Sequence, residues 1–135
     1  MSASACMNAA DVAAVRFARP TDKLADVLRF YEDGLGLERI DSFEDHAGYS
    51  GVMLGLPGEE VHLELTTHAE GSPGRAPTRD NLLVLYLRSR TAIDEIEERM
   101  RTLGHAPVEP ENPYWRDDLT FEDPDGWRVV LRYVS

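Results

Sequence analysis

The sequence predicts an α+β fold in which one unit, a strand followed by a helix and three more strands, occurs twice. Each half of the chain has one amphipathic helix, and segments of alternating apolar and polar residues follow it. The segment "AEGSPGRAPTRD", rich in glycine, proline and charge, separates the halves. The halves are about equal in length, although few side chains match between them. Such a repeat predicts two related modules, each with one helix covering one sheet face and leaving the other face free.

At 135 residues the chain is long enough for one compact domain with its own core. We expect a mobile leader over residues 1–11 and a single domain over residues 12–135. Within the domain, the expected parts are a first module over about 12–68, a linker over about 69–79 and a second module over about 80–135.

The first module begins with a strand in which Val15 and Phe17 alternate with Arg16, so the two apolar side chains are expected to face the helix. The helix is expected over 22–37, with apolar residues at helical spacing and glycines at its end. The strands of this module are expected at 13–20, 38–43, 49–56 and 60–68.

The second module repeats this pattern, with a helix over 90–104 whose apolar stripe includes Ile93, Ile96 and Met100. Its strands are expected at 81–87, 106–111, 117–123 and 127–134, and the segment 106–111 has the poorest strand pattern. The tetrapeptide Asp-Pro-Asp-Gly over 123–126 joins the last two strands. It is predicted to be a turn, because proline fixes φ while aspartate and glycine accept tight conformations. A calcium loop is rejected, because Arg132 stands where a later glutamate ligand would be needed.

Composition narrows the class of function. The formal charge of −11, from 25 acidic and 14 basic residues, disfavours a nucleic-acid partner. No apolar run approaches the length of a membrane span, and the N-terminus lacks the pattern of a signal peptide. Cys6 is the only cysteine, so no intramolecular disulfide can form. These features favour a cytoplasmic protein with no membrane partner.

Three segments carry a resemblance to a known family: "FYEDGLGLE" at 30–38, "HLELT" at 62–66 and "FEDPDGWRVVL" at 121–131. On two βαβββ units at this spacing, they resemble the vicinal-oxygen-chelate superfamily, which includes glyoxalase I, bleomycin-resistance proteins and extradiol dioxygenases. The resemblance implies the glyoxalase/bleomycin-resistance fold, in which two modules form an open curved mixed sheet around a cavity. It also implies a homodimer.

In metal-dependent members of that superfamily, four ligands come from the first, fourth, fifth and eighth strands. The resemblance places these positions at Arg16, Glu64, Leu82 and Val130. Only Glu64 has the chemistry of a ligand, and a transition metal needs three or four N, O or S donors. We therefore expect no metal cofactor, which puts glyoxalase and dioxygenase activity in doubt. A relocated metal site would involve His62 and Glu64, with His68 as a third ligand.

The candidate binding residues are Arg16, His62, Glu64, Tyr86, Tyr114 and Trp115. Arg16 and Glu64 are expected to form an ion pair that orients a polar ligand, or else a purely structural salt bridge. Glu64 is also the candidate general base, and His62 is expected at the rim. The aromatic residues are placed to stack on a flat ligand, whereas Trp115 can instead fill the core or a dimer contact.

Two hypotheses follow. The first is a metal-independent protein that binds a small organic molecule, as bleomycin-resistance proteins do. The second is an enzyme of the same superfamily, a lyase, isomerase or dioxygenase, that uses Glu64 as a base or a metal at relocated ligands.

Overall fold

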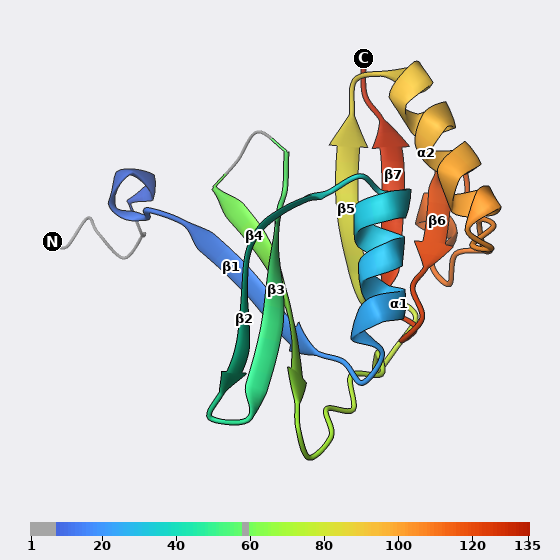
Figure 1. Ribbon diagram of the computed structural model, residues 1–135. Coiled ribbons are helices and arrows are strands. Elements are labelled where there is room, and N and C mark those ends of the chain that lie inside the picture. The colour runs from blue at the N-terminus through green and yellow to red at the C-terminus, as the bar shows by residue number, and fades with distance from the viewer. Residues whose placement is uncertain (1–7, 58–59) are drawn as a thin grey trace, which may run out of the picture.

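The computed structural model describes residues 8–57 and 60–135. Residues 1–7 of the predicted leader, including Cys6, lie outside the described residues. The rest of the leader contains one short 3-10 turn, η1 (Ala9–Asp11), whose residues are all exposed. In Figure 1 this turn lies away from the body of the molecule, at the end of the segment that leads into the first strand.

The first module is a four-stranded sheet with one helical segment. Its strands are β1 (Val15–Pro20), β2 (Glu38–His46), β3 (Tyr49–Gly55) and β4 (Val61–His68), in the spatial order β1-β4-β3-β2. β1 is parallel to β4, and the other pairs are antiparallel. The helix α1 (Leu24–Leu28) continues directly into a π-helical segment, η2 (Arg29–Gly34). The predicted βαβββ order of this module is confirmed.

The helical segment differs from the prediction at both ends. It begins at Leu24 rather than at residue 22, because the backbone of Lys23 is not helical; the Asp22 carboxylate accepts a hydrogen bond from the backbone N–H of Ser72 in the linker. At its other end the Leu35 N–H donates to the Phe30 carbonyl, five residues back, at 3.0 Å. That register is π-helical, and a 3.6-residue apolar period does not distinguish it from an α-helix.

The second module is a three-stranded sheet with a longer helix. Its elements are β5 (Leu82–Leu87), α2 (Arg90–Thr102), the 3-10 turn η3 (Pro113–Trp115), β6 (Leu119–Glu122) and β7 (Arg128–Tyr133). The order is β5-β7-β6, with β5 parallel and β6 antiparallel to β7. The turn expected between the last two strands is confirmed: the Gly126 N–H donates to the Asp123 carbonyl at 2.9 Å.

The strand predicted over 106–111 is wrong, because this segment is irregular in the structure. Val108 donates one hydrogen bond to the Thr120 carbonyl at 2.8 Å, as a strand beside β6 would. Pro107 and Pro110 have no N–H, so they cannot contribute donors to a ladder. The segment instead runs into η3, where the Asn112 side chain accepts a hydrogen bond from the Tyr114 N–H at 3.0 Å.

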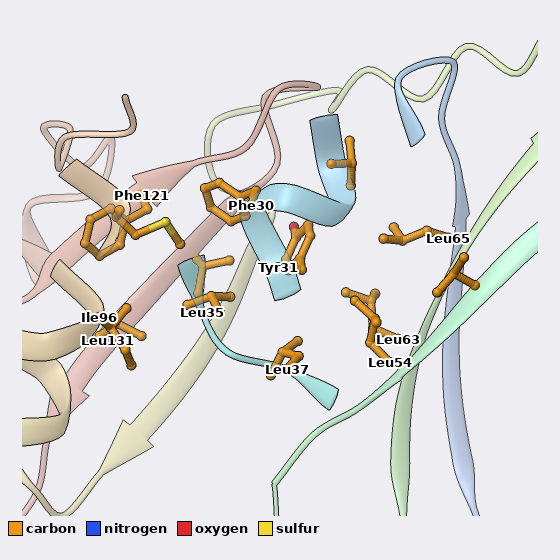
Figure 2. Close-up of a cluster of buried hydrophobic side chains, with 14 of the residues drawn as sticks. Phe30, Tyr31, Leu35, Leu37, Leu54, Leu63, Leu65, Ile96, Phe121 and Leu131 are labelled. Carbon is orange, nitrogen blue, oxygen red and sulfur yellow. The ribbon is translucent and has the colours of Figure 1, made fainter. Parts of the chain in front are cut away.

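The core forms where α1 and η2 lie between the two modules. Figure 2 shows Leu54, Leu63 and Leu65 of the first sheet on one side of this segment, and Phe121 and Leu131 of the second module on the other. The segment itself contributes apolar residues to both sides, and α2 completes the second layer.

Gly34 allows η2 to approach α2 closely. A Cβ added at Gly34 would lie 2.6 Å from the Sδ of Met100, closer than side-chain carbons pack. This contact joins the two helical segments into one layer. α1 packs against β4 of the first sheet, and α2 packs against β5 and β7 of the second.

Each sheet therefore has one face toward the helices and one face away from them, which we call its open face. The four-stranded and the three-stranded sheet are hydrogen-bonded as separate sheets. The predicted α+β architecture of two modules with mixed sheets is confirmed, with the two open faces turned outward from the helical layer. Within the described part of the chain, no helix is long and apolar enough to cross a membrane.

Candidate functional site

Arg16 and Glu64 lie beside each other on the open face of the first sheet. In the parallel β1–β4 pair, Arg16 is in register with His62, so Arg16, His62 and Glu64 point to the same side. Arg16 Nη1 lies 3.8 Å from Glu64 Oε1, a contact at the long limit of an ion pair. The Glu64 side chain is 13% exposed and the Arg16 side chain 46% exposed. Nearly half of the Arg16 side chain is therefore accessible.

His62 is largely buried next to this pair. Its Nδ1 is shielded from solvent and has no hydrogen-bond partner within the described residues. Its Nε2 lies 3.7 Å from Glu60 Oε2, too long for a hydrogen bond. A buried imidazole nitrogen without a partner is uncommon, because leaving it unsatisfied costs free energy. His62 Nδ1 is therefore an unsatisfied polar atom beneath the surface at the start of β4.

The three aromatic candidates lie on the second module. Tyr86 is in register with Arg132 on the open face of the second sheet and is exposed. The Arg132 guanidinium carbon lies 4.7 Å from the ring centroids of both Tyr114 and Trp115. Arg132 also donates to the Asp118 carboxylate, at 2.8 Å from Nη2. Arg132 thus holds Tyr114 and Trp115 in place, and the sequence analysis did not identify this role.

Tyr114 and Trp115 do not have the same environment. The Tyr114 ring is exposed, whereas Trp115 is partly buried and covers Thr120 and Val130 on the second sheet. Trp115 therefore fills part of the open face, in line with the core-filling alternative, and Tyr114 remains accessible for stacking. The hydrogen bond from Arg132 to Asp118, and then the one to the Tyr114 hydroxyl, raise the pKa of Arg132.

The six predicted residues thus form two groups of three. Arg16, His62 and Glu64 lie on the first sheet, and Tyr86, Tyr114 and Trp115 lie on the second module.

The residues at the superfamily's metal positions do not fit a metal ion. Arg16 is a cation, and Leu82 and Val130 have no donor atoms. Leu82 and Val130 line a small gap next to Trp115, which apolar and polar residues share, and Val130 is fully buried. Glu64 is the only one of the four positions that carries an oxygen ligand, so this donor set cannot coordinate a transition metal.

The relocated metal site is not formed either. His62 pairs with Gly55, but His68 pairs with Tyr49 at the opposite end of β4. Six residues of strand separate the two histidines, roughly 20 Å. The His68 Nδ1 already accepts a hydrogen bond from the Glu70 N–H at 3.0 Å. Across residues 8–57 and 60–135, no group of three or more His, Cys, Asp or Glu side chains is placed to hold a metal ion.

A cleft of about 230 Å³ separates β1 from β5. Its walls are mainly apolar and come from Val15, Phe17, Leu56, Val61, Leu63, Leu82, Leu83 and Trp127, and its polar lining residues are Arg19, Tyr31, His62, Asn81 and Arg128. Phe17 is on the predicted helix-facing side of β1, yet its side chain is 71% exposed, because α1 does not cover this end of the sheet. The expectation that the helix covers Phe17 is therefore wrong.

A buried ionic cluster lies at the inner end of this cleft. Arg19 Nη1 donates to Asp125 at 3.1 Å, and its Nη2 donates to Asp123. The hydroxyls of Tyr31 and Thr21 donate to Asp123 at 2.7 Å and to Asp125 at 2.6 Å. The turn at 123–126 is thus more than a connection, because its two carboxylates bind the end of β1 and the π-helical segment. Burial raises the pKa of Asp123, and the Arg19 guanidinium opposes that effect.

One signal in the sequence could have revealed this cluster. Arg19 follows Val15 and Phe17 on the helix-facing side of β1, and it is the one of these three that is buried. A buried arginine needs carboxylate partners. Asp123 and Asp125, two residues apart in a turn, are the acidic pair that the structure supplies.

A second depression, of about 360 Å³, lies between η2 and α2. Its lining residues are Asp33, Glu95, Glu98, Arg99, Thr102 and Leu103. It is an open, acidic surface away from all the candidate residues, typical of a solvated helix face.

Comparison with known proteins assigns both modules to the same family. Residues 15–66 match the model of the YycE-like N-terminal domain, and residues 80–133 match that of the YycE-like C-terminal domain. The uncharacterised protein YycE of Bacillus subtilis strain 168 is 47% identical over 120 residues, covering 88% of this chain and 86% of YycE.

Solved structures support the same relationship. The crystal structure of a YycE protein of unknown function from Bacillus subtilis aligns with a TM-score of 0.86 and 45% identity, covering 91% of this chain and 90% of that one. Leishmania major glyoxalase I aligns with a TM-score of 0.67 and 20% identity, covering 88% and 84%. TnmS3, an antibiotic binding protein from Streptomyces sp. CB03234, aligns with a TM-score of 0.64 and 21% identity, covering 93% and 98%. The last two likenesses concern the fold alone.

Proposed function

The chain belongs to the YycE-like family of the glyoxalase/bleomycin resistance/dioxygenase superfamily, and from this premise we propose that it binds a small organic molecule without a metal ion. The proposed site is the open face of the first sheet around Arg16, His62 and Glu64. The observation that carries the proposal is the ion pair of Arg16 and Glu64, at 3.8 Å, where the superfamily's metal ligands are expected. The site thereby offers a cation and a carboxylate in place of a Lewis acid.

The chemistry of these groups restricts the ligand. Arg16 provides several N–H donors with a partly exposed guanidinium, which suits a carboxylate or phenolate on the ligand. Glu64 accepts hydrogen bonds or binds a cationic group. The accessible rings of Tyr86 and Tyr114 lie on the second module, so within one chain they do not add to this site.

The binding protein TnmS3 has the same fold, which supports antibiotics as one ligand class to test. Its identity of 21% is too low to transfer its ligand to this chain.

Thermal stability in the presence of ligands tests this proposal. Wild type, treated with EDTA, is screened against aromatic antibiotics and aromatic carboxylic acids. A ligand at 100 times its Kd stabilises the native state by about 2.7 kcal/mol, a rise in Tm of roughly 10 °C for a domain of this size. We expect Arg16→Ala and Glu64→Ala each to remove most of that rise. Arg101→Ala is the matched control, because the Arg101–Glu97 pair lies on the exposed side of α2. A stabilisation that EDTA abolishes, or that survives both site variants, contradicts the proposal.

A second candidate function is metal-independent enzyme catalysis, with Glu64 as the base. The largely buried Glu64 carboxylate favours it, since Glu64 would take the proton while the half-exposed Arg16 guanidinium would hold an oxyanion of the substrate. Loss of turnover in Glu64→Gln with ligand binding retained separates this function from binding alone.

A further inference from the structure

A closed gap lies on the open face of the second sheet, next to Trp115. Its volume is about 160 Å³, and it is too narrow to hold a water molecule. Leu82, Thr120 and Val130 of the sheet line it on one side. Residues of the irregular segment 110–115 line it on the other side and form its cover, with Trp115 lying over Thr120 and Val130.

The Thr120 hydroxyl is the feature of this gap that needs an explanation. Thr120 is 2% exposed, and its Oγ1 is buried without a hydrogen-bond partner in the described part of the chain. Because the closed gap has no room for water, water does not satisfy this oxygen either. An unsatisfied buried hydroxyl costs free energy that a valine of similar shape would avoid. A threonine at this position is therefore suited to a polar partner that reaches it when the cover is open.

The cover is fixed to the sheet at its two ends by arginines of β7. Arg128 Nη1 donates to the Glu109 carbonyl at 2.9 Å, and Arg132 Nη2 donates to the Asp118 carboxylate at 2.8 Å. Between these points the chain contains two prolines and the three-residue turn η3 rather than a strand of the sheet. The cover can therefore move as a short loop between two fixed points, while the sheet under it stays unchanged.

The Trp115 indole closes the gap through packing. It lies edge-on to Tyr114, with 4.8 Å between the ring centroids, and the Arg132 guanidinium carbon lies 4.7 Å from its centroid. The hydrogen bonds that Trp115 makes to the described residues come from its backbone. Trp127, in contrast, is fixed through its ring, since its Nε1 donates to the Gly74 carbonyl at 2.6 Å. The Trp115 side chain can thus turn away from the sheet without breaking such a bond.

We propose that the segment 110–117 is a lid, and that a neutral aromatic compound with one hydrogen-bonding group opens it and binds at Thr120. The ring of the ligand takes the place of the Trp115 indole over Leu82 and Val130. Its polar group bonds to Thr120 Oγ1, which can donate or accept. This pocket lies on the second sheet, so it is separate from the Arg16–Glu64 site on the first.

The charges around the gap favour a neutral ligand. The charged residues that line it are two basic and two acidic ones, Arg79, Arg128, Asp80 and Glu111. Their formal charges cancel, and Arg128 is already paired with Glu122 at 3.1 Å. A charged ligand would lose its hydration here without gaining a free counter-charge, whereas a neutral ring with one polar group would not.

Fluorine NMR of protein labelled with fluorotryptophan tests the lid, with indole as the probe. Trp115 and Trp127 are the two tryptophans of the chain, so two resonances are expected, and Trp115→Phe assigns them. Indole is expected to move the Trp115 resonance toward its position in the urea-unfolded chain, because the side chain enters solvent. The Trp127 resonance is the internal control and is expected to stay in place. A Trp115 resonance that indole leaves unchanged would overturn the proposal.

Calorimetric titration with indole tests the pocket itself. Thr120→Val removes the hydroxyl and is expected to weaken indole binding about threefold to tenfold, as for the loss of one hydrogen bond, without lowering the Tm. Trp115→Ala is expected to bind indole at least about tenfold more tightly, because no lid side chain has to be displaced. A thermal melt establishes that each variant is folded.

Arg16→Ala is the matched control, and it separates this proposal from the proposed function. It removes the cation of the first-sheet site and is expected to bind indole as the wild type does. Loss of indole binding in Arg16→Ala would place the probe on the first sheet and overturn the lid proposal. Wild-type affinity in folded Thr120→Val or in folded Trp115→Ala would overturn it as well.

Discussion

Arg16 and Glu64 are unequal partners, and that inequality matters for binding. Glu64 is largely buried and fixed by β4, whereas Arg16 lies on an end strand with nearly half of its side chain exposed. Because the Arg16 side chain is nearly half exposed and makes a single long contact, solvent screens this pair. The single long contact leaves the Arg16 guanidinium with unused donors, and the proposed function assigns these donors to a polar group of the ligand.

Tyr31 belongs to the buried ionic cluster, and its environment there shifts the pKa of its phenol. Burial first, and then the negative charge of Asp123, raise the pKa of Tyr31 above its ordinary value of 10.0. In the unfolded chain the phenol ionises near pH 10, while in the native state it stays protonated. Above pH 10 the native state therefore binds more protons than the unfolded state, and the free energy of unfolding falls as pH rises.

We accordingly predict that the urea midpoint of the wild type decreases between about pH 9 and about pH 11. The decrease is expected to be smaller in Tyr31→Phe, which has no phenol to ionise. Tyr133→Phe, with a partly exposed ring at the C-terminus, is the control and should follow the wild type. Equal decreases in wild type and Tyr31→Phe would contradict this account of Tyr31.

For single residues, the alternation of side chains along a strand predicted which of them share a face. Alternation along β1 and β4 was sufficient to predict that Arg16 and Glu64 share one face. It was not sufficient to identify the partners of Arg19, because Asp123 is 104 residues away in the sequence. The role of Arg132 in holding Tyr114 was likewise hidden, because it depends on how an irregular segment crosses β7.

Among the elements, the turn at 123–126 connects the modules most directly. Its two carboxylates bind Arg19 at the end of β1, and Lys23 Nζ donates to the Pro124 carbonyl at 3.2 Å. The linker packs on the same turn, since the Ala76 N–H donates to the Asp125 carbonyl at 2.9 Å. This arrangement fixes the angle between the modules and thereby positions the edges of both sheets.

Removing the cation from this cluster should be strongly destabilising. In Arg19→Met, two buried carboxylates lose their counter-charge, and we expect the free energy of unfolding to fall by about 3–5 kcal/mol. Urea denaturation measures the change. Arg101→Met, which breaks an exposed pair on α2, is expected to cost less than about 1 kcal/mol. If the two variants lost the same small amount, the cluster would not be what joins the modules.

The helices and strands of the structure were predicted near their bounds, except for the segment 106–111 and the end of the first helix. β1, β3, β4 and α2 were found near their expected bounds because apolar residues alternate or repeat along them. The segment 106–111 had the poorest strand pattern, and its prolines remove donors that a strand needs. The π-helical end of the first helix depends on contacts with α2, which local sequence does not contain.

For the whole molecule, the repeat predicted two modules but not how they pack. Within one chain, the helices lie in the angle between the sheets and the open faces point outward (Figure 1). That angle depends on long-range contacts such as Gly34 with Met100 and Arg19 with Asp123. It explains why Arg16 and Tyr114 belong to different surfaces of one chain, although the sequence placed them in one site.

The central claim is that Arg16 and Glu64 form a ligand site that works without a metal ion. Elemental analysis of the purified protein, before and after incubation with Mn, Fe, Ni and Zn salts and removal of free metal, tests it most directly. The donor set predicts less than about 0.1 ion per chain under every condition. One tightly bound ion per chain, lost in Glu64→Ala, would contradict the claim and return the site to metal-dependent chemistry.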